Sequence, residues 1–331
     1  MFGTKIWKVI LGLVTAVALA GCGAGNVPTQ SNGQPAAGGE SQKLKLYTSI
    51  YPLEYISKRI GGDHVEVTNL VPAGVEPHDF EPTAKDIVAL SDANLFVYNG
   101  SGFELWVDKA VEGLDKAKTT VVNTTEGLHL LPAEAAAHEE HGEGSESATE
   151  TESGHEHGAY DPHVWLDPIL LKAQAEKVKH ALVEKDQAHR ADYEKNFARL
   201  AADLDKLDQE FKDMVAKAGN KEFMVAHSAF GYMAHRYGLE QIAISGISPA
   251  DEPSPGEMKE LVEHVKEHNI KYVLFETLVS PKVAEVIARE AGVKTATLNP
   301  LEGLTREEAA AGKDYLSIMR ENLETLRTAL H

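Results

Sequence analysis

Three histidines are candidates for metal chemistry, because each lies where a strand-like stretch gives way to a loop. They are His78, His163 and His227. Neutral imidazole is the borderline-soft nitrogen donor that zinc and the neighbouring transition metals prefer. Three imidazoles from distant segments form one site if the fold brings them together. The sequence therefore predicts a zinc site made by these three side chains.

Cysteine usage narrows the choice of other ligands. Cys22 is the single cysteine of the 331-residue chain. No disulfide can form within the chain, and no thiolate is left inside the folded part to hold a metal. Any metal site must therefore use histidine, aspartate or glutamate side chains.

The N-terminal residues are predicted to be an export signal followed by a tether. Residues 1–21 carry Lys5 and Lys8 before an apolar run that is short for a membrane-spanning helix, which is typical of a signal peptide. Leu19-Ala20-Gly21-Cys22 resembles the bacterial lipobox, so Cys22 is expected to be lipidated and to anchor the protein on the extracytoplasmic face of the cell membrane. An ordinary signal with a chance cysteine is the alternative. Residues 22–43, rich in Gly, Pro and Ser, are typical of a flexible tether.

The chain is strongly acidic, with a formal net charge of −19. Such a charge disfavours nucleic acid as a partner, and it disfavours a purely electrostatic attachment to anionic lipid. The residues after the tether are numerous enough for two compact domains. No second stretch of the sequence is long and apolar enough to cross a membrane, and a monomer is expected.

The order of the predicted elements indicates an α/β protein. Strands over 44–49 and 65–71 enclose a helix, which is the β-α-β unit of a parallel sheet, and the same alternation returns in the second half. Between the halves, apolar residues at helical spacing predict one long helix. We therefore expect an N-terminal α/β domain over 44–186, a rigid linking helix over 187–218 and a C-terminal α/β domain over 219–331.

The three histidines are expected to meet in the cleft between these domains. His78 follows a Pro- and Gly-rich loop at the carboxyl edge of the first sheet, where α/β proteins place their ligands. His227 ends a strand and is expected to occupy the equivalent place in the second half, with His163 at the foot of the linking helix. For each histidine, a structural role satisfied by backbone groups is the alternative. His264 and His268, on a helical segment rich in Lys and Glu, are expected to be exposed.

Residues 134–160 interrupt the periodic pattern. The segment is highly charged and poor in bulky apolar residues, so a mobile loop is expected there. Four histidines lie among its carboxylates and are expected to form a secondary zinc-collecting loop: His138, His141, His155 and His157. The alternative is a solvated loop whose histidines bind metal only incidentally.

The histidine motifs resemble those of a known family. His78-Asp79-Phe80, His163-Val164-Trp165-Leu166-Asp167-Pro168 and His227-Ser228-Ala229-Phe230 resemble the zinc and manganese solute-binding lipoproteins of bacterial ABC importers. The resemblance extends from Leu44 to the C-terminus and includes the long helix. It implies two small βαβ-type domains joined by one rigid helix, with metal held between them and delivered to a membrane permease driven by an ATPase. It also implies that the acidic His-rich insertion marks the zinc branch.

One position departs from this family. Asn299 stands in the turn after the last predicted strand, where many members have Asp, and an amide is a poor zinc ligand. The fourth coordination position is therefore expected to hold water. Glu76, Glu276 or a histidine of the insertion are the alternatives, and Asn299 itself remains a candidate for the surroundings of the site.

Two other functions compete with that of a zinc-binding transport protein: manganese binding on the same scaffold, and zinc-dependent hydrolysis. Manganese members of the family tend to use two histidines and two carboxylates, which suit a harder ion, and His227 stands where they generally have Glu. Zinc is therefore expected, with manganese as the alternative. Three histidines and an open position could also activate water in a zinc hydrolase. The sequence contains no HExxH pair and no general base beside a ligand, so a non-enzymatic protein is expected.

Overall fold

The computed structural model describes residues 43–133 and 159–331. The predicted signal peptide, Cys22 and nearly all of the predicted tether lie outside these residues. The same is true of His138, His141, His155 and His157 in the predicted zinc-collecting loop. The expectations for these segments therefore stay predictions.

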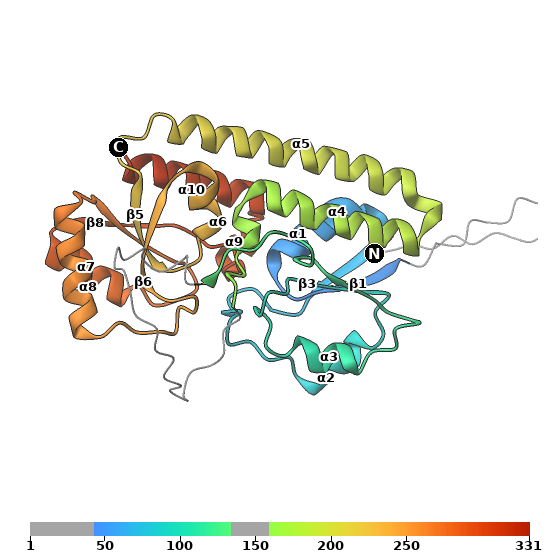
Figure 1. Ribbon diagram of the computed structural model, residues 1–331. Helices are drawn as coiled ribbons and strands as arrows, with labels where there is room; N and C mark the ends of the chain where they lie inside the picture. The colour runs from blue at the N-terminus through green and yellow to red at the C-terminus, as the bar shows by residue number, and fades with distance from the viewer. Residues whose placement is uncertain (1–42, 134–158) are drawn as a thin grey trace, which may run out of the picture. The chain divides into compact units, whose positions relative to one another are not determined.

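Two four-stranded parallel sheets form the framework of the described residues (Figure 1). The strand order is β2-β1-β3-β4 in the first sheet and β6-β5-β7-β8 in the second, so the two halves share one topology. This confirms the predicted α/β class with βαβ-type halves. The strands are β1 (Leu44–Thr48), β2 (Val65–Asn69), β3 (Leu95–Tyr98), β4 (Thr120–Asn123), β5 (Glu222–His227), β6 (Glu240–Ser245), β7 (Tyr272–Phe275) and β8 (Lys294–Thr297).

Several helices begin at residues whose side chains cap the free N–H groups of the first turn. Thr83 and Ser254 each form a reciprocal capping box, with Asp86 and Glu257 respectively. The α-helices in the described part of the chain are α1 (Tyr51–Gly61), α2 (Ala84–Leu90), α3 (Val107–Glu112), α4 (Pro168–Lys185), α5 (Arg190–Val215), α6 (Gly231–Tyr237), α7 (Pro255–Glu267), α8 (Lys282–Ala291), α9 (Arg306–Ala310) and α10 (Tyr315–Ala329).

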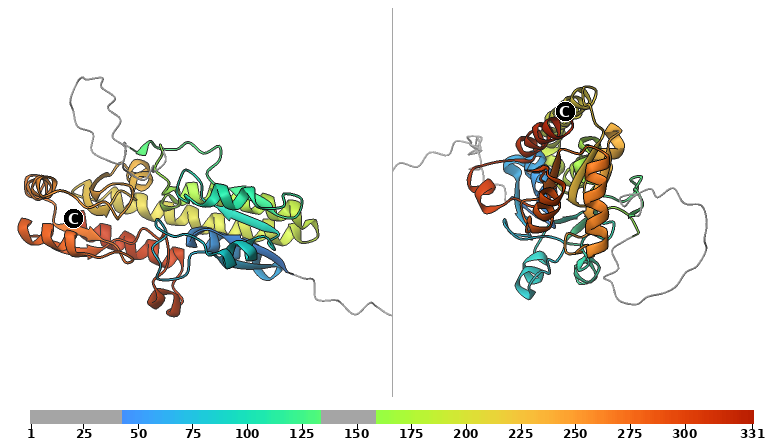
Figure 2. Two further views of the ribbon diagram at one scale, coloured as in Figure 1. Left: turned by 90° about the horizontal axis from the view of Figure 1, so that it is seen from below. Right: turned by 90° about the vertical axis from the view of Figure 1, so that its left-hand side faces the viewer.

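The 26-residue helix α5 is the predicted long helix between the halves. It runs over α4 in the first half and over α10 in the second (Figure 1), and Figure 2 shows α5 and α10 side by side. Its buried apolar stripe recurs at helical spacing: Tyr193, Leu200, Leu204, Leu207, Phe211, Met214 and Val215. Because α5 packs on α1 and α4 of the first half and on α6 and α10 of the second, it links the two halves.

The halves also share one hydrophobic core, which extends from β1 to α10. Trp165 is fully buried within it. The Trp165 indole N–H donates to the carbonyl of Pro300 (2.8 Å), and the Trp165 carbonyl accepts from the Tyr315 hydroxyl (2.6 Å). These bonds connect segments more than a hundred residues apart. Within residues 43–133 and 159–331, the helices do not combine the length and apolar character that crossing a membrane requires.

Candidate metal centre

The local structure around His163 differs from the expected strand end. Tyr160 makes an isolated antiparallel bridge with Pro132, and the chain then passes His163 into a short 3-10 turn, Val164–Leu166. Asp167 caps the next helix by accepting from the N–H groups of Ile169 and Leu170. That helix is α4, so the prediction that His163 lies at the foot of the linking helix is wrong.

The positions of His78 and His227 also require a correction. His227 is the last residue of β5, a central strand of the second sheet, and pairs in register with Ser245 of β6. His78 instead lies in the loop after β2, an edge strand of the first sheet. The strand equivalent to β5 is β1, so the two histidines do not occupy equivalent places in the repeated topology. They nevertheless reach the same point, because the loop after β2 is long.

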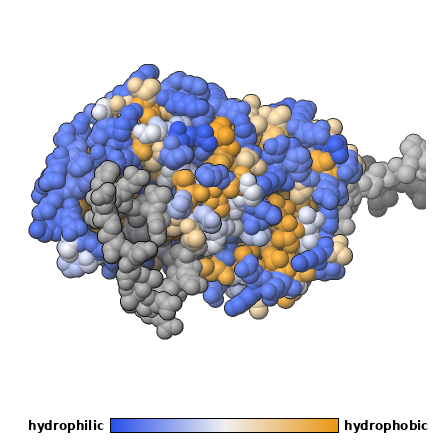
Figure 3. All heavy atoms as spheres, in the orientation of Figure 1, coloured by the Kyte–Doolittle hydropathy of each residue, from blue (hydrophilic) through white to orange (hydrophobic). Residues whose placement is uncertain are grey.

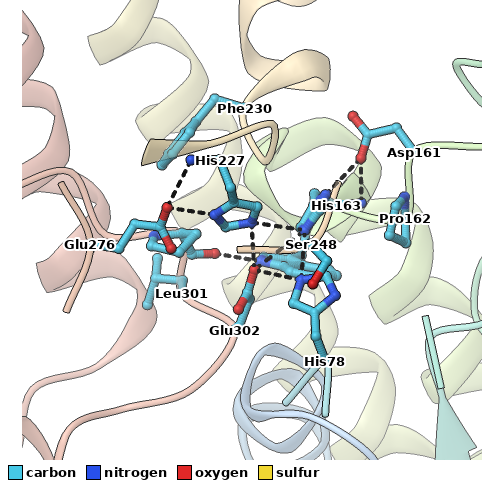
Figure 4. Close-up of polar contacts among 12 residues, drawn as sticks. His78, Asp161, Pro162, His163, His227, Phe230, Ser248, Glu276, Leu301 and Glu302 are labelled. Atoms are coloured by element: carbon cyan, nitrogen blue, oxygen red, sulfur yellow. Dashed lines mark hydrogen bonds and ion pairs between the residues drawn. The ribbon is translucent and has the colours of Figure 1, made fainter. Parts of the chain in front are cut away.

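The three imidazoles converge on the carboxylate of Glu302 (Figure 4). The Nε2 atom of His163 lies 3.3 Å from that of His78 and 3.4 Å from that of His227. Glu302 Oε1 lies 3.2, 3.3 and 3.1 Å from the Nε2 atoms of His78, His163 and His227. A zinc ion about 2.0–2.1 Å from four tetrahedral donors would separate those donors by about 3.3–3.4 Å. Five of the six separations among the four donor atoms therefore match a tetrahedral zinc site, and all four atoms lie within 4.8 Å of one another.

Glu302 comes from the loop after β8, and a tight turn directs it inward. Leu301, directly before it, has a φ of 56°, a left-handed conformation that is rare for a branched side chain. Asn299 supports this turn, because its side-chain oxygen accepts from the N–H of Leu301 (2.8 Å). The Asn299 backbone N–H donates to Asn322, and its side-chain amide donates to Glu308. Asn299 is thus a structural residue of the turn.

Two further carboxylates orient the imidazoles from behind. Asp161 Oδ1 lies 2.8 Å from His163 Nδ1, and Glu276 Oε1 lies 2.5 Å from His227 Nδ1 (Figure 4). A carboxylate at Nδ1 favours the tautomer that carries its proton there, which leaves the Nε2 lone pair for a metal. Asp161 is itself held by Tyr232, whose hydroxyl donates to the Asp161 carbonyl (2.8 Å).

The site is closed to solvent. The side chains of His163 and His227 are fully buried, and those of His78 and Glu302 are 4% and 2% exposed. The ring of His78 packs 4.7 Å from the ring of Phe103, and the ring of His163 lies 5.3 Å from that of Trp165. Aromatic side chains therefore form part of the wall around the four donors.

Burial and the neighbouring charges set the protonation of the cluster. Burial lowers the pKa of His78 below its ordinary value. Burial opposes charge on His163 and His227 as well, but the carboxylates around them outweigh it and raise both pKa values. For Glu302, burial is outweighed by the three histidines, so its pKa lies well below the usual range. Glu302 is thus an anionic donor, and a bound cation would displace protons from the imidazoles.

The remaining candidates for the fourth position have other roles. Glu276 contacts the Nδ1 atom of His227, on the far side of the ring from the cluster. Glu76 accepts from the backbone N–H groups of His78 and Asp79, and burial together with the charge of Glu302 raises its pKa to about 7. The expectation of water at the fourth position did not include Glu302, whose carboxylate lies there. Glu302 stands three residues after Asn299, in the same turn.

Replacing Asp161 with asparagine, or Glu276 with glutamine, should weaken zinc binding about 10- to 100-fold, because each change removes the partner that fixes an imidazole tautomer. Calorimetric or competition titration with zinc measures the change. Glu126→Gln serves as the control, because Glu126 is exposed and is not one of the carboxylates that contact the rings of His163 and His227. Unchanged affinity in both Asp161→Asn and Glu276→Gln would contradict the orienting role.

The sequence of the chain matches one family over nearly the whole described part. Residues 46–329 match the model of the family described as the periplasmic component A of the zinc-uptake complex, ZnuA. The chain belongs to this family. The match confirms the resemblance expected from the three histidine motifs. It also confirms the expectation of a non-enzymatic protein, because the family is one of uptake components.

Individual relatives of this zinc-uptake family agree with the match. The chain is 39% identical to the high-affinity zinc uptake system protein ZnuA of Bacillus subtilis strain 168, over 98% of each protein. It is also 39% identical to the zinc-binding lipoprotein AdcA of Streptococcus pneumoniae strain R6, over 86% of this chain and 55% of that protein. Among solved structures, the Zn(II)-bound ZnuA-like domain of Streptococcus pneumoniae AdcA is similar with a TM-score of 0.73 and 37% identity, over 87% of this chain and 99% of that one.

Proposed function

We propose that this protein captures zinc outside the cytoplasmic membrane and delivers it to the membrane permease of an ABC transporter, which its ATPase drives. The observation that carries the proposal is the convergence of three imidazole nitrogens and one carboxylate oxygen, with separations of 3.1–3.4 Å that suit zinc. Family membership supports it, because relatives are named as zinc-uptake and zinc-binding proteins. Zinc is the cargo of such a protein, held and then released.

The ligands in this proposal are His78, His163, His227 and Glu302. Three imidazoles favour zinc over manganese, since manganese is a harder ion and prefers oxygen donors. The two carboxylates behind the rings, Asp161 and Glu276, raise the basicity of the imidazoles without contacting the ion. Glu302 replaces the water first expected at the fourth position.

Competition between zinc and manganese tests this function directly. The purified protein, first freed of metal, is mixed with both ions at equal concentration, and the bound metal is measured by elemental analysis. Zinc should occupy the buried site, and His163→Ala should lose that zinc equivalent. Manganese in excess over zinc, or an unchanged zinc content in His163→Ala, would refute the proposal.

Two parts of the proposal concern residues outside those that the structure describes. Cys22 would carry the lipid anchor that holds the protein at the membrane, in line with the lipoprotein name of its AdcA relative. The histidines at 138, 141, 155 and 157 would collect additional zinc near the protein. Deletion of residues 135–158 should then lower the number of zinc ions bound without emptying the buried site.

A further inference from the structure

A second group of metal-ligating side chains lies at the opposite end of β5 from His227. Glu222 begins this strand, and His264 and His268 lie at the C-terminal end of α7. One ligand atom from each of the three residues lies within 4.8 Å of the others. Five residue steps separate Glu222 from His227, which places the two groups about 17 Å apart along the strand. An ion at one group therefore shares no ligand with an ion at the other.

The two histidines lie on one face of α7 because they are four residues apart. Leu261 and Val265 of the same helix pack against Met224 and Ile242 of the second sheet. This packing fixes the helix over the face of the sheet to which Glu222 also points, since Glu222 and Met224 are two residues apart on β5 and share a face. The four-residue spacing of the two histidines is visible in the sequence, but their approach to Glu222 depends on the packing of α7.

Both imidazoles direct a nitrogen at the same carboxylate oxygen. His268 Nδ1 lies 2.7 Å from Glu222 Oε2, and His264 Nε2 lies 3.3 Å from it. The two rings stack at 3.9 Å with an angle of 11° between their planes. Zinc bonds of about 2.0–2.2 Å would need donor separations of about 3.3–3.6 Å, so small side-chain rotations make room for an ion among the three atoms.

The surroundings favour a cation. The C-terminus of α7 carries the partial negative charge of the helix dipole. Glu240 pairs in register with Glu222 on β6 and is exposed, which adds a second carboxylate on the same face. The ammonium groups of the nearby Lys221 and Lys271 donate hydrogen bonds to the backbone carbonyls of Val215 and His331. They are therefore directed at the backbone and not at Glu222. The end of the molecule that carries α7 and α8 also presents mainly hydrophilic residues on the face seen in Figure 3.

We propose that Glu222, His264 and His268 form a second zinc site, accessible to solvent and weaker than the buried one. The side chains of His264 and His268 are 22% and 42% exposed, so water can complete the coordination. Three protein donors and partial exposure give a lower affinity than four donors in a closed site. The site needs none of the four donors of the buried cluster, so the two can be tested separately.

Zinc titration of the full-length protein, starting with the buried site filled, tests this inference. The double variant His264→Gln/His268→Gln should bind one zinc ion fewer than the parent, and Glu222→Gln should bind that ion at least tenfold more weakly. His180→Gln is the matched control, because His180 is an exposed helical histidine beside a single carboxylate, Glu176, at 3.7 Å. It should bind zinc as the parent does.

The buried zinc equivalent, retained in each variant, shows that the protein has folded. Equal stoichiometry and affinity in the parent and the double variant would overturn the inference.

A second measurement does not depend on variants, since the imidazole ¹⁵N resonances of His264 and His268 in the parent should shift as the second equivalent is added. Unshifted resonances would overturn it as well. Loss of the buried zinc in His163→Ala, with the shifts at His264 and His268 retained, separates the two sites.

Discussion

Glu302→Gln should weaken zinc binding by about 3–5 kcal/mol, or roughly 150- to 5,000-fold, because it removes the single anionic donor from a closed site. Glutamine keeps the size of the side chain, so the loss reports charge and not packing. The dication would then remain in a buried pocket with three neutral imidazoles. Zinc affinity is measured by competition with a chelator of known strength.

Glu76→Gln is the matched control for Glu302→Gln. Glu76 lies in the same region and was an alternative for the fourth ligand, but its carboxylate accepts from backbone N–H groups of the His78 loop. Its substitution should change zinc affinity much less. A large loss in Glu76→Gln together with a small loss in Glu302→Gln would exchange the roles assigned to the two carboxylates.

Trp165→Ala should lower the free energy of unfolding of the zinc-free protein by about 3–5 kcal/mol, because Trp165 is fully buried between the halves. The indole also donates to Pro300, two residues before Glu302, so the loop that carries Glu302 loses a support. Denaturant unfolding followed by circular dichroism measures the change. Trp165→Phe, which keeps most of the ring, should cost about 1–3 kcal/mol through the unpaired carbonyl of Pro300.

Trp106→Ala provides the comparison for Trp165→Ala, since Trp106 is only partly buried and packs against Phe80 and Phe96 within the first half. Its loss should destabilise the protein less. Equal destabilisation by Trp106→Ala and Trp165→Ala would contradict the idea that Trp165 ties the two halves together.

The fold could be predicted well from the sequence because its signals are local. Alternating strands and helices, the capping boxes at Thr83 and Ser254 and the apolar stripe of α5 each follow from short-range patterns. The meeting of His78 and His227 could also be predicted, since ligands gather at the carboxyl edges of parallel strands, whereas His163 reaches the same point from the turn before α4. The order of strands within each sheet has no such local signal, and the mistaken equivalence of His78 and His227 follows from that.

Glu302 could not be identified because its direction depends on one backbone angle. The left-handed φ of Leu301 turns the chain so that Glu302, and not Asn299, faces the histidines. Leucine rarely adopts this conformation, so the sequence gives no reason to expect it. The group of Glu222, His264 and His268 was missed for a different reason. His264 and His268 look like ordinary surface histidines until the packing of α7 places them over the first residue of β5.

The closure of the zinc cluster has a kinetic consequence. A chelator dissolved outside cannot touch an ion whose four donors are almost wholly shielded, and those donors come from segments of both halves. The rate of zinc release is then set by the rate at which these segments separate, and it does not depend on the strength of the chelator. A receiving membrane protein would have to hasten that parting, by favouring a form in which the Glu302 loop or the His78 loop has swung aside.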